Sequence, residues 1–178
     1  DVERSRGLGD VYKRQVIIPA IYSFLQQDYP RELYDIIVIS DQMQESTNEA
    51  LRQLPVRLLI ADYTDSSKAK AMSLAMNATA DIPYDAVVIM DADNTAGTSF
   101  LSELNPVFQS GARAVQAHRT AKNTNTDIAV LDAASEEINN SIFRSGHIAL
   151  GLSSALIGSG MALEACWFRQ HIHQFIIQ

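Results

Sequence analysis

Two aspartates, Asp91 and Asp93, stand one residue apart directly after the apolar run Ala86–Met90. That run has the length and composition of a buried strand, so both carboxylates would leave the same strand end. Carboxylates at this spacing can offer oxygen ligands to one hard divalent cation, and Mg²⁺ or Mn²⁺ suits such ligands better than zinc. The alternative is structural, because aspartates at strand ends also form turns and cap helices.

Other polar residues that could bind a ligand also come directly after apolar runs or at the start of the next segment: Asp41, Asp62 and Lys68. In parallel α/β sheets the carboxyl ends of the strands share one edge, where ligands bind, so we expect Pro19, Ala20, Asp41 and Asp62 to lie on one edge with the aspartate pair. Carboxylates there would repel one another unless a cation or ligand lay between them. Taken singly, the aspartates are typical of solvated turns and the lysine of an exposed surface, although a lysine can also bind phosphate.

Apolar runs of strand length alternate with segments of helical spacing. The runs rich in β-branched residues are 16–20, 35–40, 56–61, 86–90 and, more weakly, 114–118. The helical segments are 47–54, 67–78, 100–109, with Thr98 and Ser99 as capping candidates, and 127–143. Continuously apolar strands between helices predict an α/β, Rossmann-like domain whose mostly parallel sheet is covered by helices on both faces.

Composition limits the partners. The 178 residues include 14 Lys and Arg against 21 Asp and Glu, a formal net charge of −7 that repels nucleic acid and anionic membranes. Cys166 is the only cysteine, which excludes an internal disulfide. We expect residues 1–15 to be a disordered tail foreign to the fold and 16–178 to form one domain. The apolar stretch 148–167 is interrupted by serines and Glu164, so we expect no membrane span there.

Six motifs in this order resemble the family 2 glycosyltransferases of the GT-A fold, over residues 16 to about 169. They are Val16–Ala20, Gln27–Pro30 with Glu32–Ile36, Ser40–Asp41, Lys68–Met72, Met90–Asn94 and Gly158–Ala162. The resemblance implies a GT-A-like domain that binds a nucleotide-diphosphate sugar, with a UDP-sugar as the expected donor, and transfers the sugar to a saccharide or lipid-linked acceptor. It also implies bacterial polysaccharide or glycolipid assembly, in the cytoplasm or at the cytoplasmic face of the membrane, with membrane contact only through parts absent from this sequence.

The resemblance assigns roles residue by residue. Pro19 and Ala20 would border the nucleoside, Asp41 would contact the base, and Lys68 would match a lysine of the family's donor site. Asp91 would lie against the ribose or metal, and Asp93 of the Asp-x-Asp motif would ligate the Mg²⁺ or Mn²⁺ that bridges the diphosphate. The residues implied to border the acceptor are Gly158, Ser159, Gly160 and Met161.

The sequence departs from the family pattern in three ways, one of which is the absence of the Gln-x-x-Arg-Trp motif of processive members. After Pro19-Ala20 it passes directly into Ile21–Leu25, without the polar Asn-Glu segment that normally precedes the first helix. The acidic pair that contains the family's catalytic base has no match, and Glu164 is expected on a helix face instead. We therefore expect a domain incomplete at its C-terminus, with the base beyond Gln178 and with little or no transfer activity, because a base must reach the hydroxyl it deprotonates.

Two other functions remain open from the sequence. Val87–Thr95 also resembles the first motif of haloacid-dehalogenase-type phosphatases, in which Asp91 would be the nucleophile beside Mg²⁺. That chemistry needs a downstream lysine, for which Lys122 is the candidate, and a second acidic pair, which the sequence does not supply. A non-catalytic Rossmann-like nucleotide-binding domain is the other alternative, although no Gly-x-Gly-x-x-Gly follows the first apolar run.

Overall fold

The computed structural model describes residues 15–65, 67–117 and 159–175. The chain divides into two compact units, the first from residues 1–87, 91–113 and 163–178 and the second from 88–90 and 114–162. The tail expected at 1–15 lies outside the described residues except for Gln15, and the helix expected at 127–143 lies outside them entirely.

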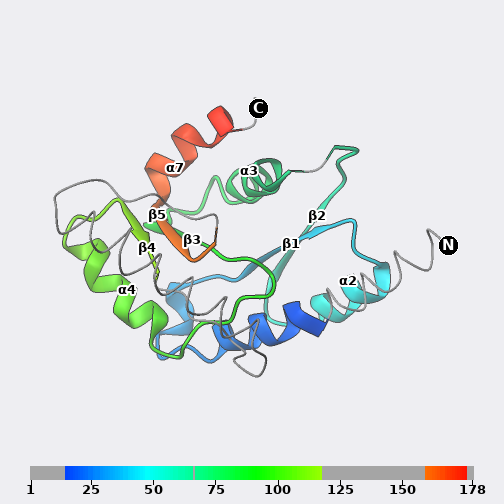
Figure 1. The fold of residues 1–178 in the computed structure, drawn as a ribbon, viewed down its shortest axis with the longest axis horizontal. Coiled ribbons are helices and arrows are strands. Elements are labelled where there is room, and N and C mark those ends of the chain that lie inside the picture. Colours follow the sequence, from blue (N-terminus) through cyan, green and yellow to red (C-terminus); the bar gives the residue numbers. More distant parts are fainter. Residues whose placement is uncertain (1–14, 66, 118–158, 176–178) are drawn as a thin grey trace, which may run out of the picture. The chain divides into compact units, whose positions relative to one another are not determined.

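The first unit contains a parallel β-α-β arrangement. Strand β1 (Ile37–Asp41) pairs in parallel with β2 (Arg57–Ala61), so that Val38 lies opposite Leu58 (Figure 1). Helix α2 (Glu45–Arg52) connects the two strands, and α3 (Lys68–Ala78) follows β2 and contacts both of them. The predictions of strands at 35–40 and 56–61 and of helices at 47–54 and 67–78 are therefore confirmed, with slightly shifted ends.

Three further predicted elements are also present. Strand β3 (Ala86–Ile89), α4 (Phe100–Gln109) and β4 (Ala114–Gln116) match the expected positions. Strand β5 (Met161–Glu164) lies between β3 and β4 in a three-stranded sheet. The described chain is completed by α7 (Ala165–His171) and the short 3₁₀ helices η1 (Arg31–Leu33) and η3 (Ile172–Phe175). The mixed α/β class is confirmed.

The prediction of a strand at Val16–Ala20 is wrong, because residues 15–25 are helical. Ile17 and Ile21, four residues apart, are 5% and 4% exposed and share one buried helix face. A strand followed by a helix needs a connecting loop of about two to six residues, and this sequence has none between Ala20 and the next apolar residues. Without that loop the helical spacing continues through the apolar run.

The helix at residues 15–25 takes the place of a predicted strand, and the sheet differs from the predicted one as a result. In a doubly wound sheet the first strand lies between the second and the fourth, so a strand at residues 16–20 would join β1 to β3. With that segment helical, the described strands form two sheets, β1–β2 and β3–β5–β4, in place of one.

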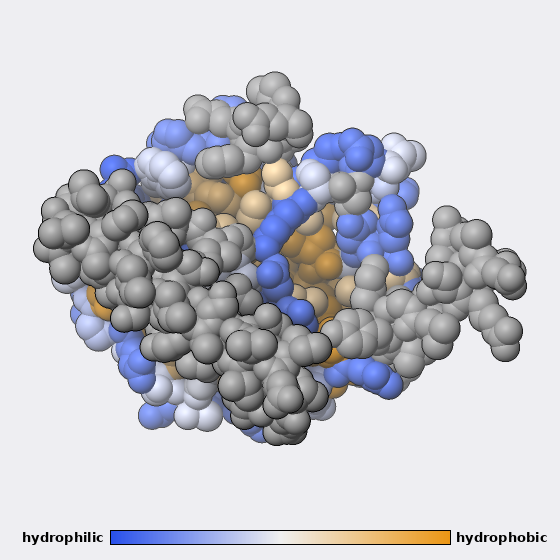
Figure 2. Space-filling view, viewed as in Figure 1, coloured by the Kyte–Doolittle hydropathy of each residue, from blue (hydrophilic) through white to orange (hydrophobic). Residues whose placement is uncertain are grey.

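The core of the first unit lies between helix 15–25 and the β1–β2 sheet. Ile17, Ile21, Val38 and fully buried Leu51 form one cluster, with Leu58 among the partly buried residues packed against it. Burying a side chain of this size contributes about 1.5–3 kcal/mol, so this cluster carries much of the unit's stability. Figure 2 shows that apolar residues also reach the surface on one face, bordered by hydrophilic ones.

Two arginines donate hydrogen bonds to carbonyls at the C-terminal end of α3 and just beyond it. Arg57 of β2 donates to the Ala78 oxygen at 2.6 Å, and Arg169 of α7 donates to the oxygens of Thr79 and Ala80. Carbonyls at a helix C-terminus have no partner within the helix, and cations there also suit the helix dipole. These bonds fix where α3 ends, and hence where Lys68 at its other end lies. Within the described parts of the chain, no helix has both the length and the hydropathy needed to cross a membrane.

Candidate functional site

Lys68 and Asp91, two of the predicted site residues, form an ion pair in the first unit. The Lys68 Nζ lies 2.5 Å from Asp91 Oδ1, and the two side chains are 44% and 47% exposed. Ser67 is the N-cap of α3 and accepts a hydrogen bond from the Lys70 backbone N–H, which makes Lys68 the first residue of the helix. The structure therefore brings the start of α3 to the loop that follows β3.

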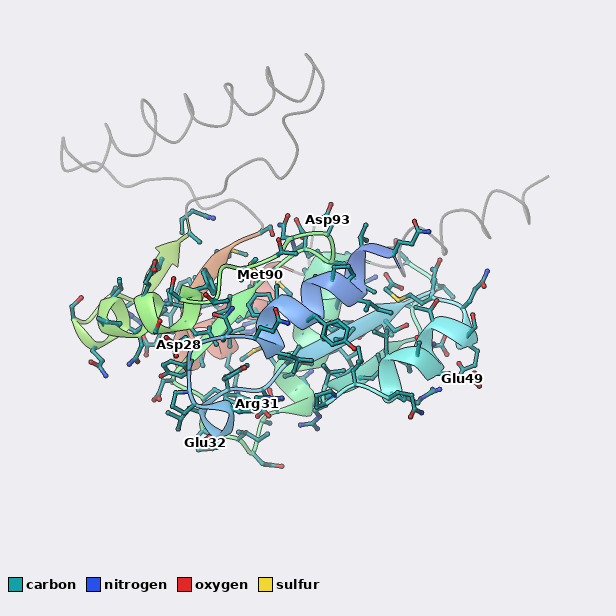
Figure 3. The ribbon with its side chains drawn as sticks, turned by 90° about the horizontal axis from the view of Figure 1, so that it is seen from below. Asp28, Arg31, Glu32, Glu49, Met90 and Asp93 are labelled. Atoms are coloured by element: carbon teal, nitrogen blue, oxygen red, sulfur yellow. The ribbon has the colours of Figure 1, made fainter. Side chains whose placement is uncertain are left out.

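Asp93 lies in the same loop. The Asn94 backbone N–H donates to the Asp91 carbonyl at 3.1 Å, so a turn places Asp91 and Asp93 on one short segment. Asp93 is exposed, and its side chain points away from the ribbon (Figure 3). The turn that was considered as a structural alternative is present, and it leaves the Asp93 carboxylate accessible to a ligand.

Asp41 is the last residue of β1 and is half-buried. Next to it, Ser40 is 1% exposed and its hydroxyl donates to Asn48 Oδ1 of α2 at 2.6 Å. Gln42 follows with a φ of 52°, in the left-handed region that non-glycine residues rarely adopt, and this ends the strand. Asp62, by contrast, is exposed directly after β2, as expected for a solvated turn residue.

Pro19 and Ala20 lie on helix 15–25 and not at a strand end. Ala20 is 6% exposed, so little of its side chain is available to a nucleoside, whereas Pro19 is exposed. The strand end that was to carry both residues to the donor is absent from the structure.

Residues 159–161 belong to the second unit, and Gly158 lies outside the described residues. Ser159 is 1% exposed. Gly160 has a φ of 70°, donates its N–H to the Ile89 oxygen at 2.8 Å and accepts from the Ala117 N–H at 2.7 Å. A glycine is required here because the backbone is left-handed while both of its polar groups are bonded. Met161 is half-buried at the start of β5.

Glu164 ends β5 and serves as the N-cap position of α7, so the expectation of a helix-face position is wrong. Its carboxylate pairs with Arg113, whose Nε lies 2.9 Å from Glu164 Oε2. The Glu164 carboxylate therefore forms an ion pair between β5 and the residue that precedes β4.

The described residues contain no cluster of three or more His, Cys, Asp or Glu side chains that could hold a metal ion by themselves. Mg²⁺ is commonly held by only one or two carboxylates together with substrate phosphates and water. The exposed Asp93 and the half-buried Asp91 on one turn are such a pair, so the residues present fit a metal that arrives with a diphosphate.

Sequence patterns assigned no role to two polar residues that shape this region, although Gln27 begins one of the motifs that resemble the family. Asn48 holds the end of β1, and the buried Gln27 contacts the loop between β3 and α4. Each stands inside a helical or turn segment with no distinctive spacing, so only its contacts reveal its role.

Comparison with known families settles the family. The family described as "Glycosyltransferase like family 2" matches residues 12–169. The chain belongs to this family. No significant match was found among curated proteins.

Family 2 membership fits the mixed α/β structure, which is that of a GT-A-like domain. It supports a glycosyltransferase among the three functions that the sequence left open. A family 2 glycosyltransferase acts on a nucleotide-sugar donor and an acceptor, and divalent metals are common in this family.

Proposed function

We propose that this chain binds a nucleotide-diphosphate sugar, with UDP as the nucleotide, at the end of β1, the start of α3 and the loop after β3. The supporting observation is the Lys68–Asp91 ion pair, because it joins a cation to a predicted metal ligand from a segment 23 residues away. The sugar would be transferred to a saccharide or lipid-linked acceptor, as in bacterial polysaccharide assembly at the cytoplasmic face of the membrane.

Each residue then has a distinct role. Asp93 and Asp91 would hold Mg²⁺ or Mn²⁺, and Asp41 would contact the base. When bound, the ion would neutralise charge that develops on the departing diphosphate. The acceptor would lie near residues 158–161.

Lys68 is suited to exchange partners. An exposed ion pair contributes only about 0–1 kcal/mol, so Lys68 loses little when it leaves Asp91 for a phosphate oxygen. The same movement would free Asp91 to face the cation. In the absence of donor, the pair would keep the two groups near their working positions and limit repulsion between Asp91 and Asp93.

No residue of this sequence matches the catalytic base of the family, so we expect donor binding with little or no transfer. An assay that detected sugar transfer by the 178-residue chain would contradict this part of the proposal.

Calorimetric titration of UDP in Mn²⁺ and in EDTA tests the site, with Asp93→Asn as the variant. A matched control is Asp81→Asn, since Asp81 is also an exposed aspartate of the first unit but lies outside the β3–α4 loop. We expect saturable binding that requires Mn²⁺, is lost in Asp93→Asn and is unchanged in Asp81→Asn. Equal affinity for UDP in the two variants would show that Asp93 is not part of the donor site.

A further inference from the structure

The buried side chain of Gln27 connects the end of helix 15–25 to the loop between β3 and α4. Gln27 is 9% exposed. Its Nε2 donates to the carbonyl oxygens of Ser23 at 2.9 Å and Gly97 at 2.7 Å, and its Oε1 accepts from the Leu101 N–H at 3.0 Å. Two carbonyls on one side and an N–H on the other fix the orientation of the amide and satisfy both of its donors.

Gln27 also caps α4. Leu101 is in the first turn of that helix, where backbone N–H groups have no partner within the helix. The N-cap residue Ser99 makes no capping bond, because its hydroxyl donates to Glu103 Oε1 instead. The expectation that Ser99 caps α4 through its side chain is wrong, and an amide 74 residues away in sequence meets the Leu101 N–H in its place.

Two further bonds join the same segments. The Ser23 hydroxyl donates to the Ala20 oxygen at 2.7 Å and accepts from the Ala96 N–H at 3.0 Å. The Asp28 N–H donates to the Thr98 oxygen at 2.7 Å. Thus residues 23–28 bind consecutive backbone groups of residues 96–98, and we call this contact the loop anchor.

The ring of Phe24 supports the loop anchor. It meets Phe100, the first residue of α4, edge to face with a centroid separation of 6.1 Å and an interplanar angle of 87°. Such an arrangement is a favoured geometry for aromatic pairs, so an apolar contact joins the same two segments as the polar bonds.

We propose that Ser23 and Gln27 are positioning residues for the Asp91–Asp93 turn. The turn belongs to the same unit as the loop anchor, and only Asn94 and Thr95 separate Asp93 from Ala96, whose N–H is bound by Ser23. A short tethered segment has few conformations to lose when a ligand binds, which strengthens binding without any new contact. The effect on ligand affinity rests on the proposed function, whereas the ordering of the loop does not.

Amide hydrogen exchange of the ligand-free chain tests the ordering. In Gln27→Met the side chain keeps its length and loses all three bonds, so we expect exchange at residues 96–101 to rise by about tenfold or more, since local opening sets the rate. The strands β1 and β2 should keep their protection. The matched control is Gln26→Met, an exposed glutamine next in the chain, which should change nothing.

Three finer variants separate positioning from general destabilisation. Ser23→Ala should raise exchange at Ala96, while Ser23→Thr, which keeps the hydroxyl, should restore protection. Gly97→Ala should be neutral, because no atom lies within 4 Å of the added Cβ and only the Gly97 carbonyl takes part in the anchor.

Titration of UDP with Mn²⁺ then tests the effect of the loop anchor on ligand affinity. We expect Gln27→Met to bind UDP about tenfold more weakly than Gln26→Met, because it loses hydrogen bonds from a buried site. Unchanged exchange at 96–101 in Gln27→Met, or an equal rise across β1 and β2, would overturn the positioning role. Absence of UDP binding by the unaltered chain would instead overturn the proposed function and leave the exchange result as an independent test of the anchor.

Discussion

The Lys68 ammonium and the Asp91 carboxylate, which come from α3 and from the loop after β3, lie 2.5 Å apart on the first unit. Both side chains are almost half exposed, so solvent screens their attraction. The pair therefore matters more for where it places two charges than for stability.

Lys68→Met should separate the effect of the ion pair on ligand binding from its effect on the stability of the fold. We expect the free energy of unfolding to fall by less than about 1 kcal/mol, because exposed ion pairs contribute little. The affinity for UDP with Mn²⁺ should fall about tenfold or more, since hydrogen bonds to charged groups contribute about 1.5–3 kcal/mol.

The control for Lys68 is Arg52→Met. Arg52 pairs with Glu45 at a similar exposure, on α2. This variant should show the same small change in the unfolding free energy, measured by denaturant titration, and no change in UDP affinity. Equal losses of affinity in both variants would argue against a phosphate contact for Lys68.

Pro19→Ala tests the helical state of residues 15–25. Proline inside a helix removes a backbone donor and is less favourable than alanine by about 3 kcal/mol, so the substitution should stabilise the chain, by about 1–3 kcal/mol. Pro83→Ala is the comparison, because Pro83 lies outside the helices and its loss only adds freedom to the unfolded chain.

The signs of the two proline variants should therefore differ in urea unfolding. Stabilisation in Pro19→Ala with slight destabilisation in Pro83→Ala is the expected pattern. A loss of stability in Pro19→Ala would favour the strand that the sequence predicted for residues 16–20.

Tyr84 predicts a pH dependence of stability. Burial, together with the hydrogen bond from its hydroxyl to Asp35 Oδ2 at 2.5 Å, raises the pKa of Tyr84 from 10.0 to about 12. Because the folded pKa lies above the unfolded one, this contribution is fully present below about pH 10 and is lost as the pH rises through about 12.

Chemical denaturation at several pH values measures this effect. We expect the stability difference between the unaltered chain and Tyr84→Phe to shrink over that alkaline interval. Tyr22→Phe, which changes a tyrosine that is 47% exposed, is the matched control for loss of a phenol hydroxyl. Phenolate absorbance would report Tyr84 ionisation directly, and ionisation of Tyr84 near pH 10 would contradict the prediction.

The sequence predicted the elements whose patterns are long or continuously apolar. Strands such as β1 and β3 consist largely of β-branched residues, and α3 and α4 keep helical spacing over ten or more residues. Local composition therefore decides the structure of these elements. The aspartates at the ends of β1 and β3 could then be predicted to lie at one edge of a sheet. The ion pair between Lys68 and Asp91 was not predicted, because it depends on where the start of α3 lies relative to the loop after β3.

The failures have a common physical cause. A short apolar run such as 16–20 fits a strand or a buried helix equally well, and the connection that follows it decides between them. The capping of α4 also depends on a distant partner, since Gln27 reaches Leu101 from a separate segment while the adjacent Ser99 does not. Neither outcome is encoded within a window of neighbouring residues.

The loop anchor has a consequence for how the chain folds. Its bonds from Gln27 join residues 70 and 74 positions apart, so a long stretch of chain must be closed before any of them can form. Contacts of such separation carry a large closure entropy and tend to follow local pairing, as in β1–α2–β2. The Asp91–Asp93 turn should then become ordered late in folding, and mild denaturant should release it while the β1–β2 core is still intact.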